Sequence, residues 1–184
     1  DDFNGAYQEG VGYYQMTERN GLRCSTAVAY LRDAEKRPNF KIETHALVSR
    51  VLMENRKAIG IEYTKNGQVH KAMASGEVIL SAGSIGSPQI LQLSGIAAGD
   101  MLKSKGIEVI HNLEGVGKNL QDHLQVRMIY KCKRPVSIND TIRNPFKKAM
   151  IGLEFIFNRS GILTIGAGQA GGFVKVMPGA DKPD

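Results

Sequence analysis

The sequence is poor in the residues and segments that mark several large classes of protein. Its 184 residues include two cysteines and no tryptophan. Cys24 and Cys132 lie far apart and lack the spacing of metal ligands, so we expect two reduced thiols and no metal site. No apolar run approaches the length of a membrane span, and the N-terminus lacks the basic and apolar regions of a signal peptide. These absences favour a cytoplasmic protein, and the lack of an initiator methionine is typical of a piece of a longer chain.

Positive charge is in modest excess, with a net charge of +6 and a pI near 9.3. A nucleic-acid-binding protein would concentrate this charge on one face and add aromatic side chains. Here the lysines and arginines are scattered, and there are only six phenylalanines and six tyrosines. We therefore expect no nucleic-acid partner. Hydrophobic residues make up 42% of the chain, an ordinary share that allows one good core or two small ones.

Residues 77–96 combine three physical signals in one short window. Residues 77–80 are mostly apolar, as in a buried parallel strand. Residues 81–87 are mostly small, so backbone there can approach a ligand closely. Pro88 then suits the first turn of a helix, with Ser87 as its N-cap. A strand, a small-residue loop and a helix N-terminus form a place where α/β folds hold anionic cofactors.

The rest of the chain predicts a mixture of strands and helices. Asn20-Gly21 and Asn66-Gly67 are strong turn signals, and Ser25 or Thr26 can cap a short helix. Gly106 suits the position just after a helix. Helices are predicted at residues 27–31, from Pro88 onward, at 99–105 and at 145–157. Strands are predicted at residues 11–16, at 40–44 with a continuation through 46–48 and 51–52, and at 58–63, 69–72, 77–80, 107–110, 125–131 and 173–176.

Residues 77–96, taken with residues 115–123, resemble the glucose-methanol-choline (GMC) oxidoreductases, a family of flavoproteins that oxidise alcohols. The family's second signature has a small pair, Ser/Thr-Pro, two aliphatic residues and then Ser-Gly-aliphatic-Gly. The chain supplies Gly83-Ser84, Ser87-Pro88, Ile90-Leu91 and Ser94-Gly95-Ile96, with Ala97 in place of the final glycine. The phrase Gly-x-Asn-Leu-Gln-Asp-His at residues 117–123 is also typical. Further matches resemble the bacterial choline dehydrogenase and aliphatic alcohol dehydrogenase branch, at residues 2–5, 13–15, 20–23, 161–164 and 171–173.

The resemblance implies a mixed α+β and α/β fold. It consists of part of an FAD-binding, Rossmann-like domain with a β-meander, plus the start of a substrate domain built on an antiparallel sheet. Residues 1–20 would be a lead-in strand of the substrate domain, residues 21–120 a partial FAD-binding domain and residues 121–184 a partial substrate-binding domain. The family's opening Gly-x-Gly-x-x-Gly motif and its catalytic histidine segment have no match in the 184 residues. We therefore expect a middle portion whose catalytic base lies beyond Asp184, and which alone neither binds FAD tightly nor oxidises alcohol.

Four residues are expected to contact the cofactor. Val48 matches a family position whose backbone meets the adenine of FAD. Ser81, Ala82 and Gly83 match the strand end beside the FAD adenosine and pyrophosphate, where small side chains leave room. The alternative is that these small residues only allow tight packing of strand against helix. The resemblance favours the cofactor.

The histidines are weaker candidates. Asp122 could orient His123 as a catalytic pair, but we favour a polar junction that satisfies backbone groups between domains. His45, His70 and His111 fall in strand or loop patterns and are expected to face solvent, without the spacing of metal ligands.

The expected function is therefore that of an FAD-dependent oxidoreductase acting on CH–OH groups. It would oxidise choline or an aliphatic primary alcohol to the aldehyde by hydride transfer to flavin N5, with a quinone or oxygen as electron acceptor. The alternative is a non-catalytic scaffold module that binds a protein partner or a lipid surface. The predicted helix at residues 145–157 could lie on lipid at the inner face of a membrane, but packing on the substrate-domain sheet is favoured.

Overall fold

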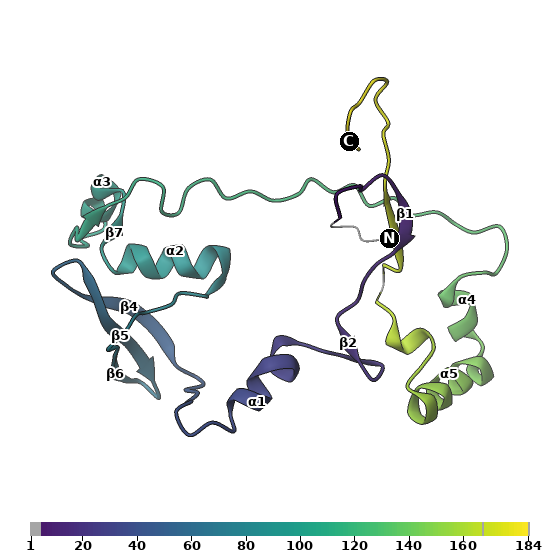
Figure 1. The fold of residues 1–184 in the computed structure, drawn as a ribbon, viewed down its shortest axis with the longest axis horizontal. Helices are drawn as coiled ribbons and strands as arrows, with labels where there is room; N and C mark the ends of the chain where they lie inside the picture. Colours follow the sequence, from purple (N-terminus) through teal and green to yellow (C-terminus); the bar gives the residue numbers. More distant parts are fainter. Residues whose placement is uncertain (1–4, 167, 184) are drawn as a thin grey trace. The chain divides into compact units, whose positions relative to one another are not determined.

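The computed structural model describes residues 5–166 and 168–183 (Figure 1). Contacts divide the chain into two compact units. The central unit is Ile42–Arg127, and the terminal unit joins Asp1–Lys41 with Met128–Asp184. The predicted division at residues 20 and 120 concerns functional domains and stays a prediction, although the contacts of residues 21–41 place them with the terminal unit.

The central unit is built on a three-stranded antiparallel meander. It consists of β4 (Leu47–Glu54), β5 (Lys57–Lys65) and β6 (Gln68–Met73), in the order β4-β5-β6. Asn66 and Gly67 both have positive φ, 52° and 75°, which is the geometry of a tight hairpin turn. The hairpin predicted from this pair is confirmed.

Helices and a short parallel ladder complete the central unit. Helix α2 (Gly83–Leu93) packs on β4, and β7 (Ile96–Ala97) pairs in parallel with β8 (His111–Asn112). Helix α3 (Gly99–Ser104) follows β7 and is succeeded by Gly106 at φ 70°, as the sequence predicts. Figure 1 shows α2 lying beside the meander. Val51, Ala97 and Leu102 are buried here and form the core.

The start of α2 differs from the prediction. The helix begins at Gly83, so Pro88 lies inside it rather than in its first turn. Ser87 is not the N-cap, because its hydroxyl accepts a hydrogen bond from the backbone N–H of Ala82 at 2.9 Å. The helix thus begins five residues before Pro88.

Four predicted strands have no ladder partner in the part of the chain that the structure describes. Residues 77–80, 40–44, 107–110 and 125–131 lie outside every described strand. Ile79 is 75% exposed, so residues 77–80 do not form the buried strand expected from their apolar pattern. An apolar run shows which residues favour a strand. It does not show whether another strand lies beside them to complete the hydrogen-bonded ladder.

The terminal unit brings the two ends of the chain together. Strand β1 (Gly10–Tyr13) pairs antiparallel with β9 (Ala170–Phe173), each overlapping only part of the predicted strand. A Cβ on Gly171 would lie 2.0 Å from the Tyr14 hydroxyl oxygen, so the Tyr14 side chain packs directly against the backbone of β9. The hairpin at Asn20-Gly21 joins β2 (Glu18–Arg19) to β3 (Leu22–Arg23), and a helical turn (Ala27–Leu31) runs into α1 (Arg32–Ala34).

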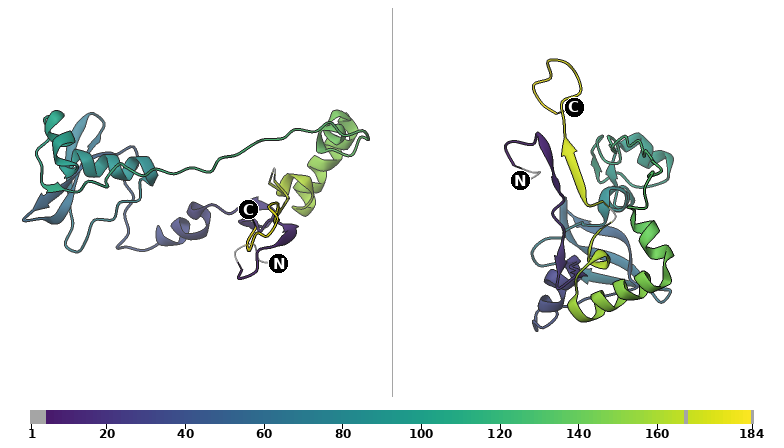
Figure 2. Two further views of the ribbon diagram at one scale, coloured as in Figure 1. Left: turned by 90° about the horizontal axis from the view of Figure 1, so that it is seen from above. Right: turned by 90° about the vertical axis from the view of Figure 1, so that its right-hand side faces the viewer.

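Two capped helices follow in the terminal unit. Ser137 and Asp140 form a capping box at the start of α4 (Ile138–Arg143). The Asn144 side chain accepts hydrogen bonds from the first turn of α5 (Pro145–Asn158), at 3.0 Å from the backbone N–H of Phe146. Pro145 occupies the first helical position, so the predicted helix is confirmed. A short 3₁₀ turn, η2 (Ile162–Thr164), comes next and contacts α5 (Figure 2). The combination of helices with an antiparallel meander confirms the α+β class.

Candidate functional site

Three of the four residues expected to contact the cofactor line one cavity. Val48 from β4 and Ser81 and Ala82 from the segment before α2 face a space of about 390 Å³. The sequence separates Val48 from Ser81 by the whole meander, and the antiparallel pairing brings them together. This volume lies within the range of small-molecule sites. We call this cavity the apolar cleft; the other residues that line it are Gly60, Ile61, Ala72, Met73, Ala74, Glu77, Val78, Ile79, Leu80 and Ile90.

The lining of the apolar cleft suits a flat, weakly polar ring. Glu77 is its one charged lining residue, and the remaining side chains are apolar or small. A Cβ on Gly60 would lie 2.4 Å from the carbonyl oxygen of Ala72, so the two neighbouring strands approach closely at this point. The cleft therefore has a floor of backbone and small side chains.

Gly83 lies next to the apolar cleft but does not line it. Its φ is 82°, a conformation that side chains rarely adopt, and a Cβ built on it would meet nothing within 4 Å. The glycine is thus required by backbone conformation rather than by packing. The space beside it is open.

A second cavity borders α2, and the sequence did not predict it as a ligand site. It has a volume of about 710 Å³ and lies between one face of α2 and residues 117–121. We call it the amide cleft; its lining residues are Ser84, Ile85, Pro88, Gln89, Gln92, Gly117, Lys118, Asn119, Leu120 and Gln121. The available signal was the repeated amide side chains, which only the fold brings to one place.

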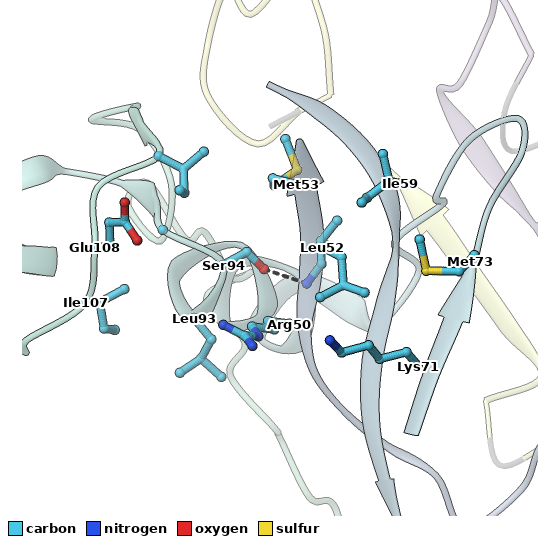
Figure 3. Close-up of a pocket in the computed structure, with 13 residues that line it drawn as sticks. Arg50, Leu52, Met53, Ile59, Lys71, Met73, Leu93, Ser94, Ile107 and Glu108 are labelled. Atoms are coloured by element: carbon cyan, nitrogen blue, oxygen red, sulfur yellow. Dashed lines mark hydrogen bonds between the residues drawn. The ribbon is translucent and has the colours of Figure 1, made fainter. Parts of the chain in front are cut away.

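A third cavity, of about 410 Å³, is a packing seam between the meander and the end of α2 (Figure 3). Ser94 is buried at its edge, where its hydroxyl donates to the Ile90 carbonyl at 2.6 Å and accepts from the Val51 backbone N–H at 2.8 Å. Ser94, the serine of the Ser-Gly-Ile motif, thus links the end of α2 to strand β4. Arg50, another lining residue, donates to Glu62 at 3.0 Å and lowers the pKa of that carboxyl.

The Asp122–His123 pair does not have catalytic geometry. The Asp122 carboxylate accepts a hydrogen bond from the backbone N–H of His123 at 2.8 Å, and both residues are exposed. His45 and His111 face solvent as predicted, but His70 is half-buried because its ring stacks on Tyr63 at 5.4 Å between centroids. Among the described residues, no group of three or more His, Cys, Asp or Glu side chains could hold a metal ion, and both cysteines are free thiols.

Helix α5 presents an apolar stripe to solvent. Its members recur at helical spacing, and Phe146 and Phe157 at its ends are 74% and 78% exposed. The stripe consists of Phe146, Met150, Leu153 and Phe157. The packing of this stripe on the substrate-domain sheet stays a prediction, as does the alternative that it lies on lipid. Within the described ranges, no helix is long and apolar enough to cross a membrane.

Comparison with known proteins identifies the class of protein to which these features belong. The family model for GMC oxidoreductases matches residues 1–125. The chain belongs to the GMC oxidoreductase family, and the resemblance inferred from the motifs is confirmed.

Individual relatives match along the whole chain. It is 48% identical to the mitochondrial choline dehydrogenase of Homo sapiens, over all of this chain and 31% of that protein. It is 44% identical to an alcohol dehydrogenase [acceptor] of Pseudomonas putida, covering 34% of that protein. The chain therefore spans about a third of the length of these curated relatives.

Solved structures show the same fold. An FAD-dependent oxidoreductase from Chaetomium thermophilum superposes with a TM-score of 0.83 at 30% identity, over 91% of this chain and 30% of that one. A formate oxidase of Aspergillus oryzae superposes with a TM-score of 0.78 at 26% identity, over 92% of this chain and 29% of the other.

Proposed function

We propose that this chain is part of an FAD-dependent oxidoreductase that acts on the CH–OH group of an alcohol. The observation that carries the proposal is the convergence of Val48, Ser81 and Ala82 on one cleft. Family membership and relatives named as choline and alcohol dehydrogenases support it.

The residues of the apolar cleft fit the adenosine end of FAD. Ser81 and Ala82 leave space for a ring, and Val48 offers a half-buried backbone beside it. Helix α2 begins without a side-chain cap and without an acidic residue in its first turn, so its first N–H groups can meet a phosphate. The role of these residues is to bind and orient the dinucleotide and to exclude water from its adenine ring.

FAD, when bound, would accept a hydride from the alcohol carbon at its N5 atom. The Asp122 carboxylate accepts a hydrogen bond from the backbone N–H of His123 and not from its ring, which supports assigning the base for the hydroxyl proton to another residue. The resemblance assigns that role to a histidine segment beyond Asp184. Choline or a primary aliphatic alcohol is the proposed substrate, and a quinone or oxygen the proposed acceptor.

A pair of matched variants in the full-length protein tests the proposal. Ser81→Phe fills the apolar cleft and should abolish retention of FAD, seen as loss of the flavin absorbance of the purified protein. Ser75→Phe makes the same change at an exposed position that does not line the cleft and should keep the flavin. Normal flavin content in Ser81→Phe would contradict the assignment.

A substrate screen separates the enzyme from the non-catalytic alternative. The full-length protein should reduce an artificial electron acceptor with choline or with a primary aliphatic alcohol. A scaffold module would show neither flavin nor turnover. The 184 residues alone are expected to show neither, and stoichiometric flavin in that piece would overturn this expectation.

We propose as a second candidate that the terminal unit contacts an anionic lipid surface. Residues 128–159 carry seven basic and two acidic side chains, a net charge of +5, next to the apolar stripe of α5. Such a combination favours the surface of an anionic membrane. Full-length protein should sediment with vesicles that contain phosphatidylserine but not with neutral ones, and Phe157→Ser should weaken sedimentation.

A further inference from the structure

Two hairpins of the structure turn at the same dipeptide. Asn20-Gly21 joins β2 to β3, and Asn66-Gly67 joins β5 to β6. A basic residue precedes each pair, and the two asparagines have φ values of 53° and 52°. The glycines that follow them, with φ values of 68° and 75°, are also alike. The chain thus places one short motif in one backbone conformation twice. A third Asn-Gly pair begins at Asn4, which lies outside the described residues.

An asparagine that precedes glycine loses its side-chain amide without the help of an enzyme. The backbone nitrogen of the glycine bonds to the side-chain carbonyl carbon of the asparagine, and ammonia leaves with the proton of that nitrogen. Water then opens the succinimide ring to give aspartate or isoaspartate. Glycine favours the attack because it has no side chain to hinder its nitrogen. Ring closure needs a geometry that a folded tight turn does not offer, so local opening of the turn sets the rate.

The turn at Asn66-Gly67 lies at the exposed tip of its hairpin. A Cβ on Gly67 would meet no described atom within 4 Å, and both turn residues are exposed. The turn follows directly on the pair formed by Lys65 and Gln68, which ends the β5–β6 ladder. Opening of this turn therefore disturbs only the last pair of the ladder, and the rest of the two strands stays paired.

The turn at Asn20-Gly21 packs against another segment of the terminal unit. A Cβ on Gly21 would lie 2.3 Å from the carbonyl oxygen of Arg159 and 3.0 Å from the side-chain methyl of Thr164. Thr164 is itself held in place, because its hydroxyl donates to the Gly161 carbonyl at 2.8 Å. The β2–β3 ladder has only two residue pairs, but opening of its turn must also lift Gly21 away from the segment that follows α5.

We propose that Asn66 is a site of spontaneous deamidation and that packing protects Asn20 from the same reaction. The product adds a carboxylate next to Lys65, whose ammonium pairs with Glu43 at 2.5 Å. Aspartate tolerates positive φ, so this product keeps the turn. Isoaspartate adds a methylene group to the main chain of a two-residue turn, and it therefore loosens the end of the β5–β6 hairpin.

The test follows both asparagines in one sample of the full-length protein. The protein is incubated in mildly alkaline buffer and digested, and its peptides are separated by chromatography and identified by mass spectrometry. The same incubation in denaturant gives the intrinsic rates. Thr164→Ala removes the methyl group that packs on Gly21. Thr44→Ala makes the same change at an exposed position of the central unit and is the matched control.

We expect Asn66 to be lost about tenfold faster than Asn20 in the folded protein, and the two to react alike in denaturant. Thr164→Ala should speed the loss of Asn20 and leave that of Asn66 unchanged, whereas Thr44→Ala should change neither. Equal rates in the folded protein, or faster loss of Asn20, would overturn the inference. So would a folded protein in which Asn66 stays intact while the denatured chain converts fully. An unchanged rate for Asn20 in Thr164→Ala would overturn the role given to packing.

Discussion

The central unit and the terminal unit use their apolar residues in different ways. In the central unit, Val51, Ala97 and Leu102 are buried, and α2, α3 and the meander enclose them. In the described part of the terminal unit, Cys24 is the one buried apolar side chain, while α5 presents Phe146 and Phe157 to solvent. The central unit thus encloses a core within fewer than one hundred residues, whereas the terminal unit is held by strand pairing and helix caps. Substitutions should separate these two sources of stability.

The largest effect is expected from Leu102→Ala in the central unit. Leu102 is fully buried on α3, so its truncation leaves a cavity and should cost about 2–5 kcal/mol in the free energy of unfolding. Leu153→Ala on α5 removes the same atoms from a side chain that is 47% exposed, and should cost about 1 kcal/mol or less. Hydrogen exchange of the α3 and α5 amides in the full-length protein measures both. Equal losses would show that the terminal unit has a core of its own.

A smaller effect is expected from Ser94→Ala. The change leaves the buried N–H of Val51 without its acceptor, which should cost about 1–3 kcal/mol. Ser104→Ala is the control, because its hydroxyl bonds an exposed carbonyl at the end of α3 and water can replace it. The loss should appear as faster exchange along β4. If Ser94→Ala and Ser104→Ala behave alike, the joint between α2 and β4 does not depend on this serine.

In the terminal unit, Asn144→Ala should destabilise α5 by about 0.5–2 kcal/mol, because the first turn loses the side chain that caps it. Asn139→Ala changes an exposed asparagine within α4 and serves as the control. Exchange of the first α5 amides reports the difference. An unchanged rate for Asn144→Ala would mean that packing, and not the cap, holds the helix start.

The sequence predicts features that depend on neighbouring residues better than those that depend on distant ones. Asn66-Gly67 and the start of α5 at Pro145 were predicted correctly, because turn and cap preferences act within a few residues. The start of α2 was predicted wrongly: Pro88 lies inside the helix, and the predicted N-cap Ser87 instead accepts a hydrogen bond from the backbone N–H of Ala82. Residues 77–80 have the pattern of a strand, but no pattern shows whether a partner strand lies beside them.

The same distinction applies to the candidate site. The family resemblance selected Val48, Ser81 and Ala82, and the fold brings these three residues to one cleft. Gln89 and Asn119 line the amide cleft but were not predicted to share a cavity, since glutamine and asparagine are ordinary surface residues and only the fold brings them together.

The smallest effects are expected from pH, and each unit has one carboxyl whose pKa is lowered. The Ser137 hydroxyl and backbone N–H donate to Asp140 and hold the pKa of that carboxyl below its ordinary value. A carboxyl whose pKa is lower in the folded state stabilises the fold above about pH 4, and the stabilisation is lost as pH falls through the folded value. Glu62 in the central unit behaves in the same direction, because Arg50 donates to it.

Salt should separate the two carboxyls. The partner of Asp140 is a neutral hydroxyl, whereas the partner of Glu62 is a cation. At about 1 M salt the screening length falls to roughly 3 Å. The electrostatic attraction between Arg50 and Glu62 is then weakened, whereas the hydrogen bonds from Ser137 to Asp140 are not. Carbon NMR titrations of the full-length protein should show the pKa of Glu62 rising toward its ordinary value in salt and that of Asp140 staying low. Because the capping box acts through hydrogen bonds, Ser137→Ala should raise the pKa of Asp140 at any salt concentration, and a salt-sensitive Asp140 would mean that nearby arginines hold it instead.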